Sequence, residues 1–275
     1  MSEEKEMSFL DHLEELRWHI IRAVAAIVIL AVVAFLNIDI IFGKLILGPS
    51  KIDFPTYRAL CSLGTWLGVD GLCIQKLGFI IQNRTMTGQF TTHISISILS
   101  GFIVAFPYVF WEIWRFIKPG LMETERRYTN FAVAFVTLLF LSGISFGYFI
   151  LSPLTINFLA NYQIDESIQN FVDLDSYIST LTMMVLACGI MFQLPAIVLV
   201  AAKAGILTAG LMRKFRKHSF IVILLVAAIL TPSPDMFSQL ILAIPLYGLF
   251  ELSILMAASV APKVIEAIEE AELVE

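Results

Sequence analysis

Six long apolar runs organise the sequence, and they restrict the possible folds more than any other feature. They lie at about residues 18–36, 90–110, 131–151, 177–202, 219–230 and 237–260. A helix needs about 20 apolar residues to cross a hydrocarbon core, so all but 219–230 approach or exceed a full crossing. Hydrophobic residues form 58% of the chain, against roughly 45–50% in soluble domains. We predict a single-domain, all-α integral membrane protein with six transmembrane helices.

Polar stretches flank and connect these runs. Residues 1–17 are expected to lie at the cytoplasmic surface, where SFLDHLEELR (8–17) has the pattern of a short amphipathic helix in the interface. The connection 40–87 is the longest, and its apolar pieces suggest short elements on the outer surface. The third run is expected to stop at Ser152-Pro153. The acidic tail 261–275 is expected to be a solvated helix or disordered.

Lysine and arginine positions predict the orientation of the chain. The connections 111–130 and 203–218 are basic, whereas 152–176 and 231–236 contain no lysine or arginine. Basic connections are retained in the cytoplasm, so with six spans both termini are expected to be cytoplasmic. The connection 40–87 also holds cations, but long loops carry less weight in this rule, and we expect it to be periplasmic.

The three cysteines suggest one possible disulfide. Cys61 and Cys73 share the connection 40–87, and Cys188 lies inside the fourth run. A Cys61–Cys73 bridge requires this connection to face an oxidising compartment, and two free thiols remain the alternative. Neither a CxxC motif nor a Cys/His ligand spacing occurs, which disfavours a metal site. No cofactor is expected.

Enzymatic and nucleic-acid functions find little support in the sequence. The formal net charge is −5, and nucleic-acid binding requires a clustered basic face. Residues 143–147, GISFG, match the G-x-S-x-G nucleophile elbow, but an elbow needs a strand-to-helix turn with acid and histidine partners. Close helix packing at Gly143 and Gly147 is the favoured interpretation. An intramembrane hydrolase using Ser145 is therefore disfavoured, and we expect no enzyme.

Polar side chains inside the apolar runs are candidates for function or for mutual pairing, because such groups are costly at membrane depth. The main ones are Gln193, Gln239 and Glu251. They lack the paired acid and base character of a proton relay, and no internal repeat is evident. A small-solute secondary transporter is therefore the alternative and not the favoured function.

Carboxylates on the predicted cytoplasmic side offer a second kind of site. Glu15 lies before the first run, and Glu123 and Glu125 lie in the first basic connection. Carboxylates beside Arg126 and Arg127 usually form weak local ion pairs on a wet surface. The alternative is that one or two are spare acceptors for an incoming guanidinium, since arginine and carboxylate match as a bidentate fork.

Six short motifs occur in a fixed order along the chain. They are HLEELR at 12–17, WRFIKPGL at 114–121, ERR at 125–127, FQLP at 192–195, TPSPDMFSQ at 231–239 and AIPLYGLFE at 243–251. Each is weak alone, but their order and the six spans make the sequence resemble TatC, the multi-spanning core of the twin-arginine protein translocase. The resemblance extends over residues 9–258.

The resemblance implies a receptor for folded cargo whose signal peptide carries two consecutive arginines, with export driven by the proton-motive force. It also implies a concave, glove-like bundle in the bacterial cytoplasmic (inner) membrane, in a complex containing further copies of the chain. The residues that match the family's recognition site are Glu15, Arg17, Phe116, Pro119, Glu125, Arg126 and Arg127.

The resemblance further implies single-span partners, TatA-like and TatB-like, that dock near the fifth and sixth runs within the lipid bilayer. Thr231 and Gln239 match polar positions attributed to this docking; Asp235 lies in the same motif, and Glu251 lies in the motif at 243–251. Gln193 departs from the family, which often has a glutamate there, and glutamine cannot carry charge. Trp18 and His19 replace the basic residues that often follow the first arginine.

Overall fold

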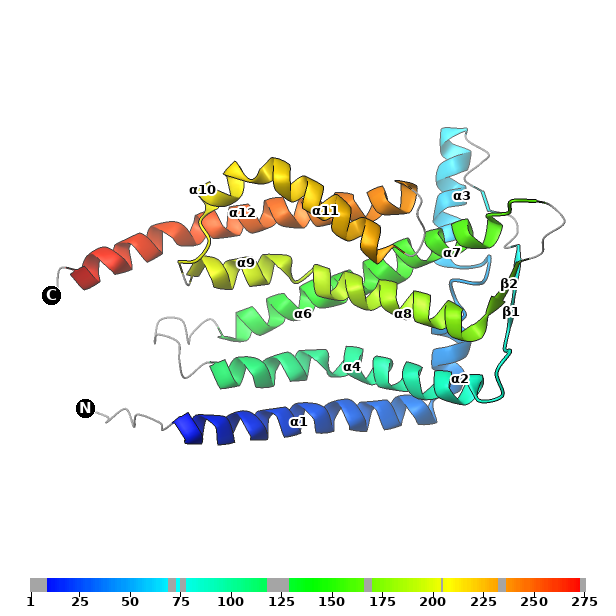
Figure 1. The fold of residues 1–275 in the computed structure, drawn as a ribbon, viewed down its shortest axis with the longest axis horizontal. Coiled ribbons are helices and arrows are strands. Elements are labelled where there is room, and N and C mark those ends of the chain that lie inside the picture. Colours follow the sequence, from blue (N-terminus) through cyan, green and yellow to red (C-terminus); the bar gives the residue numbers. More distant parts are fainter. Residues whose placement is uncertain are drawn as a thin grey trace. The chain divides into compact units, whose positions relative to one another are not determined.

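The computed structural model describes the chain in seven stretches: residues 9–68, 73–74, 78–117, 129–165, 170–203, 205–231 and 236–272 (Figure 1). Only the backbone is described for 9–12, 129–131, 237 and 260–272. The chain divides into two compact units. The first contains Met1–Leu45 and Thr85–Leu138, and the second contains Ile46–Arg84 and Leu139–Glu275.

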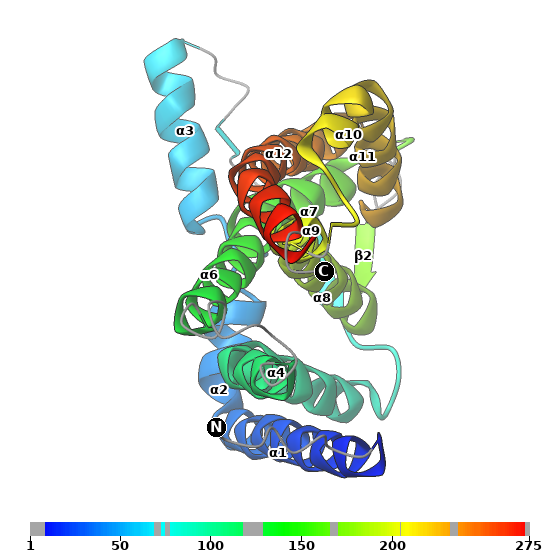
Figure 2. The ribbon, with the colours of Figure 1, turned by 90° about the vertical axis from the view of Figure 1, so that its left-hand side faces the viewer.

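The first unit is built on two long helices, α1 (Phe9–Leu36) and α4 (Gly88–Ile117), which lie side by side (Figures 1 and 2). A Cβ atom at Gly101 of α4 would lie 2.6 Å from the Ala31 nitrogen of α1, so the missing side chain allows the two backbones to touch. The His93 ring stacks on Phe35 with ring centroids 3.8 Å apart. These contacts fix α1 against α4.

Helix α1 corrects the expected N-terminal organisation. Residues 9–17 do not form a separate interfacial helix, because α1 runs without a break from Phe9 to Leu36. This stretch contains no glycine or proline to end a helix between the two parts. At 28 residues, the helix is about 42 Å long, which exceeds the roughly 30 Å hydrocarbon core. Its first turns can therefore extend beyond the membrane interior.

The third apolar run also continues further than expected. Helix α6 (Thr129–Phe146) passes through the π-helical turn η4 (Gly147–Leu151) into α7 (Ser152–Asn161), so the predicted stop at Ser152-Pro153 is wrong. Pro153 has no N–H for the carbonyl of Phe149. The Thr56 hydroxyl donates to that carbonyl instead, and the Ser152 hydroxyl donates to the Gly147 carbonyl at 2.6 Å. Side chains thus satisfy the backbone around the proline.

Close contact of the end of α6 and of η4 with α8 (Leu174–Met191) forms the centre of the second unit. A Cβ at Gly143 would lie 2.6 Å from the Cys188 carbonyl oxygen, and one at Gly147 would lie 2.9 Å from Val185 Cα. The close helix packing predicted for these two glycines is confirmed. The buried core beside this contact contains Leu151, Met184, Cys188, Ala227, Leu242 and Leu246.

The remaining helices of the second unit are α9 (Leu194–Lys203), α10 (Ala209–Lys214), α11 (Arg216–Leu230) and α12 (Met236–Glu272). The fourth apolar run is therefore divided into α8 and α9, which meet at a turn over residues 192–193. Helix α12 continues through the acidic tail to Glu272, which agrees with the helical alternative for 261–275.

Five helical stretches of the described chain are long and apolar enough to cross a membrane. They are Leu13–Leu36, Gly88–Ile117, Ala132–Asn161, Leu174–Lys203 and Ser238–Ser259. The prediction of a helical membrane protein is confirmed. The remaining predicted span, the fifth run at 219–230, corresponds to α11, whose 15 residues measure about 22 Å, shorter than a typical hydrocarbon core.

The connection 40–87 contains more regular structure than its turn signals indicated. After α2 (Ile38–Ile40) come the π-helix η1 (Ile41–Ile46), helix α3 (Pro55–Leu67) and strand β1 (Phe79–Gln82). Strand β1 pairs in parallel with β2 (Asn170–Asp173), with Phe79 opposite Asn170. The all-α prediction missed this pair, because four-residue strands from distant parts of the sequence carry no local periodic signal.

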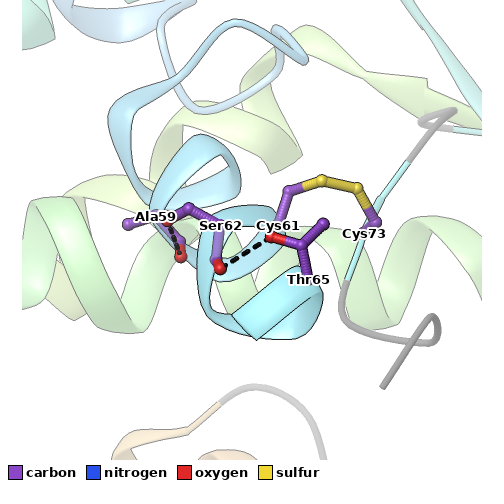
Figure 3. Close-up of a disulfide and its surroundings, with 5 residues drawn as sticks. All are labelled: Ala59, Cys61, Ser62, Thr65 and Cys73. Atoms are coloured by element: carbon purple, nitrogen blue, oxygen red, sulfur yellow. Dashed lines mark hydrogen bonds between the residues drawn. A yellow bond between two sulfur atoms is a disulfide. The ribbon is translucent and has the colours of Figure 1, made fainter. Parts of the chain in front are cut away.

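A disulfide and a buried tyrosine hold this connection in place. Cys61 of α3 is bonded to Cys73, as Figure 3 shows. The Tyr57 hydroxyl lies 3.0 Å from the Pro49 carbonyl oxygen and 2.8 Å from that of Pro153. Tyr57 therefore joins the start of α3 to α7.

Candidate functional site

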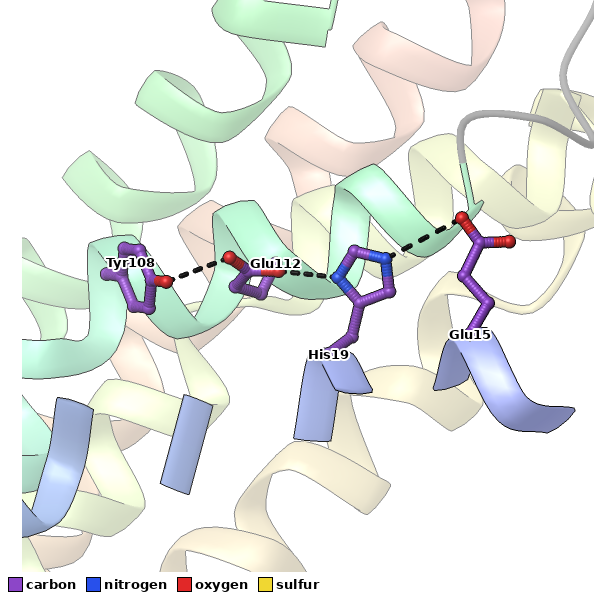
Figure 4. Close-up of polar contacts among 4 residues, drawn as sticks. All are labelled: Glu15, His19, Tyr108 and Glu112. Carbon is purple, nitrogen blue, oxygen red and sulfur yellow. Dashed lines mark hydrogen bonds and ion pairs between the residues drawn. The ribbon is translucent and has the colours of Figure 1, made fainter. Parts of the chain in front are cut away.

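A chain of polar contacts connects the beginning of α1 with the end of α4 in the first unit (Figure 4). His19 Nδ1 lies 2.5 Å from Glu112 Oε2, and the Tyr108 hydroxyl donates to Glu112 Oε1 at 2.9 Å. His19 Nε2 lies 3.9 Å from Glu15 Oε1. Glu15 and His19 are one turn apart on α1, as Tyr108 and Glu112 are on α4, which brings each pair to one helix face.

Glu112 is the buried centre of this cluster. It is 1% exposed, and His19 is 6% exposed. A buried carboxylate is tolerated only when it is paired and hydrogen-bonded, and both oxygens of Glu112 have such partners. His19 Nδ1 and Glu112 Oε2 share one short hydrogen bond. Arg22, further along α1, adds a positive charge that acts on the same carboxylate.

Glu15 has a different environment from Glu112. Its side chain is 39% exposed, and its 3.9 Å approach to His19 is too long for a hydrogen bond. Its second oxygen, Oε2, is covered by protein atoms but accepts no hydrogen bond from the described residues. A carboxylate with this exposure can accept a hydrogen bond from a cation that arrives at the surface.

Phe116 supplies the apolar side of the cluster. Its ring meets the His19 ring edge to face, with centroids 6.1 Å apart. On the same helix, the Arg115 guanidinium lies over the Trp111 ring at 5.4 Å from its centroid.

A second group of polar side chains lies between α11 and α12 in the second unit. Glu251 of α12 pairs with Arg216 of α11 at 2.6 Å and accepts from the Tyr247 hydroxyl at 3.0 Å. Gln239 Nε2 donates to the Leu224 carbonyl at 2.9 Å. The buried Thr231 hydroxyl donates to the Ala227 carbonyl of its own helix at 2.9 Å. The Arg216–Glu251 and Gln239–Leu224 contacts attach the short α11 to α12.

Comparison with known proteins identifies the family of this chain. The family described as "Sec-independent protein translocase protein (TatC)" matches residues 11–245. The chain belongs to the TatC family. Its relatives include the Sec-independent protein translocase protein TatC of Blattabacterium sp. subsp. Periplaneta americana, 37% identical over 95% of this chain and 99% of the relative. TatC of Carboxydothermus hydrogenoformans is 34% identical over 95% and 97% of the two chains.

Two solved TatC structures share the fold. A crystal structure of the twin-arginine translocase receptor TatC has a TM-score of 0.64 at 29% identity and covers 90% of this chain and 97% of its own. A second, of the same receptor in DDM, has a TM-score of 0.69 at 30% identity, with 90% and 99% coverage. The chain is therefore a multi-span membrane component of the Sec-independent protein translocase, a transport role consistent with the bacterial inner membrane.

The structure brings together part of the TatC recognition set predicted from the sequence. Glu15 and Phe116 both lie next to His19, and Arg17 is exposed on α1. The other four predicted residues, Pro119, Glu125, Arg126 and Arg127, lie outside the described residues. In the second unit, Gln193 lies at the turn between α8 and α9, and Asp235 lies outside the described residues.

Sequence reasoning missed the roles of Glu112 and His19 in this part of the TatC chain. The sequence prediction puts Glu112 in a wet connection beginning at Trp111, whereas α4 continues to Ile117 and buries Glu112. Two signals could have found the pair. His19 follows Glu15 by four residues, and an acid in the last turns of an apolar helix requires a partner.

Among the described residues, no group of three or more histidine, cysteine, aspartate or glutamate side chains converges as a metal site would require.

Proposed function

We propose that this chain is the core receptor of a twin-arginine translocation system. It binds the twin-arginine signal peptides of folded proteins at the cytoplasmic face, performs no catalysis itself, and recruits single-span partners for export driven by the proton-motive force. The observation that carries the proposal is the state of Glu15, whose Oε2 accepts no hydrogen bond from the described residues. The two solved relatives described as twin-arginine translocase receptors support it.

An arginine side chain fits the requirements of Glu15. A guanidinium presents parallel N–H groups that match both oxygens of a carboxylate. Its planar face can also rest on an aromatic ring, and Phe116 is the aromatic side chain next to His19. A lysine would bring a point charge without the fork, so the pair of arginines is the preferred ligand.

Two arginines require two acceptors. Glu112 is excluded as the second one, because it is 1% exposed and both of its oxygens have partners. We assign the second acceptor to Glu125, with Arg126, Arg127, Arg17 and Pro119 shaping the same surface, on the strength of the TatC motifs. The basic connections support a cytoplasmic position for this surface and for both termini.

Helices α11 and α12 are the proposed docking place for TatA-like and TatB-like partners. Ile221, Leu225 and Ile229 recur every four residues along α11 and are 64%, 61% and 68% exposed. A single-span helix can pack along such a stripe within the bilayer. Thr231, Gln239 and Glu251 are held at this pair of helices, and Asp235 belongs to the same motif. Further copies of the chain complete the proposed complex.

A binding comparison between two neighbouring acids tests the receptor function. We expect Glu15→Gln to weaken crosslinking to a twin-arginine signal peptide about tenfold or more, as loss of a charged hydrogen-bond acceptor predicts. The matched control is Glu14→Gln, because Glu14 is the exposed acid beside it. Glu14→Gln should crosslink like the unmodified chain. Unchanged crosslinking in both Glu15→Gln and Glu125→Gln, with normal membrane insertion, would refute the proposal.

A further inference from the structure

His19 lies between two carboxylates that hold it very unequally. Its Nδ1 is 2.5 Å from Glu112 Oε2, whereas its Nε2 is 3.9 Å from Glu15 Oε1. Only the first distance is that of a hydrogen bond. The imidazole is thus anchored on α4 by Glu112, although Glu15 is the acid one turn away on its own helix.

A histidine so placed could compete with an incoming arginine. Glutamate and a cation at positions i and i+4 of one helix pair readily. If His19 turned to Glu15, its ring nitrogen would occupy the acceptor that the proposed ligand needs. With Nδ1 at 2.5 Å from Glu112, Nε2 stays 3.9 Å from Glu15 and forms no hydrogen bond with it. The contact between His19 and Glu112 therefore determines whether the Glu15 carboxylate is available to a ligand.

The structure equips Glu112 for this task. Its burial excludes water, which strengthens the contact with His19. Tyr108 donates to the other oxygen at 2.9 Å and fixes the orientation of the carboxylate. Phe116 covers the His19 ring from the end of α4. Together these contacts hold the His19 ring against α4, with Nε2 beyond hydrogen-bond distance of Glu15.

We propose that Glu112 is a positioning residue for signal recognition: it binds His19 and thereby prevents this histidine from occupying the Glu15 carboxylate. The inference rests on the proposed receptor function and adds a specificity device to it. While His19 is bound to Glu112, the Glu15 carboxylate remains available to a guanidinium group of the signal peptide. Glu112 does not itself contact the signal peptide, because both of its oxygens are used and its side chain is buried.

A double-variant experiment tests this role. The full chain is placed in lipid nanodiscs, and the dissociation constant of a fluorescent twin-arginine signal peptide is measured beside that of the same peptide with two lysines. Glu112→Gln should weaken the twin-arginine peptide about tenfold, because the released His19 then pairs with Glu15. Glu112→Gln combined with His19→Gln should recover most of this loss, because the competitor is absent.

Two further variants separate positioning from folding. Tyr108→Phe keeps the charge of Glu112 but removes one of its donors, so it should weaken binding about two- to threefold. This effect should vanish when His19→Gln is also present. Tyr108→Phe also keeps the test decisive if Glu112→Gln fails to insert, because it changes only a hydroxyl.

The outcomes distinguish this inference from the receptor function. A chain that does not prefer two arginines to two lysines would refute both. A second outcome is that the unmodified chain prefers the twin-arginine peptide and that Glu112→Gln and Tyr108→Phe bind this peptide as tightly. This result would overturn only the role of Glu112. A loss in Glu112→Gln that persists unchanged in the double variant would also overturn it, because Glu112 would then act without His19.

Discussion

The contact of Gly143 with α8 allows a stability prediction with an internal control. A methyl group at this position would lie 2.6 Å from the Cys188 carbonyl oxygen and 2.9 Å from Gly189 Cα, well inside the roughly 3.5 Å at which non-bonded carbon atoms pack. Both neighbours are backbone atoms, so relief requires a helix to move. A methyl group at Gly248 of α12 would meet nothing within 4 Å, so this position offers the same substitution without a clash.

The magnitude follows from two opposing effects. Alanine in place of glycine stabilises a helix by about 1 kcal/mol, whereas overpacking costs about 1–3 kcal/mol and more where backbone must shift. We expect Gly143→Ala to destabilise the chain by about 1–2 kcal/mol, or roughly 2–8 °C in Tm. Gly248→Ala should raise Tm by about 2–4 °C.

Thermal unfolding of the purified chain in one detergent, followed by size-exclusion chromatography after heating, gives both values. Equal stability of Gly143→Ala and Gly248→Ala would show that α6 and α8 do not make the close contact described above.

Two other predictions concern the connection between α2 and α4. Tyr57→Phe should destabilise the chain by about 1–2 kcal/mol, since the lost hydroxyl joins two buried carbonyls. Burial raises the pKa of Tyr57. The contribution of its hydroxyl to stability should therefore persist below about pH 10, the ordinary tyrosine pKa, and be lost as the pH rises above it. Unfolding measured between neutral and alkaline pH checks this, and a pH profile identical to that of Tyr57→Phe would contradict it. Cys61→Ser should lower the free energy of unfolding by about 3 kcal/mol, because it opens the loop closed by the disulfide. It should also speed hydrogen exchange in α3, while signal-peptide binding at α1 and α4 stays unchanged. Unaltered exchange in α3 would contradict the prediction.

The spans were predictable because they depend on a property that is local and repeated. An apolar run of about 20 residues has few alternatives to a membrane helix, and the glycines at 143 and 147 indicated a helix contact from their spacing alone. Helix continuity was less predictable. Whether Pro153 ends a helix depends on Thr56, a residue far away in sequence whose hydroxyl satisfies the carbonyl that proline leaves free.

The candidate site was predictable in part for the same reason. Glu15 and Phe116 could be selected from motifs, but their common neighbour could not. The contact between His19 and Glu112 joins two helices that are distant in sequence, and the signals at each residue show that it needs a partner without showing which residue that partner is. The strands β1 and β2 were missed because their pairing is likewise a property of two segments and not of one.

The central claim is that an acceptor at the start of α1 receives the arginines of an export signal, and photo-crosslinking tests it most directly. A twin-arginine signal peptide with a photoreactive residue next to the arginine pair is irradiated with the full chain in nanodiscs, and the crosslinked positions are mapped by mass spectrometry. The account predicts crosslinks within residues 12–19 and around the end of α4. Crosslinks confined to α11 and α12 or to the connection 40–87 would contradict it.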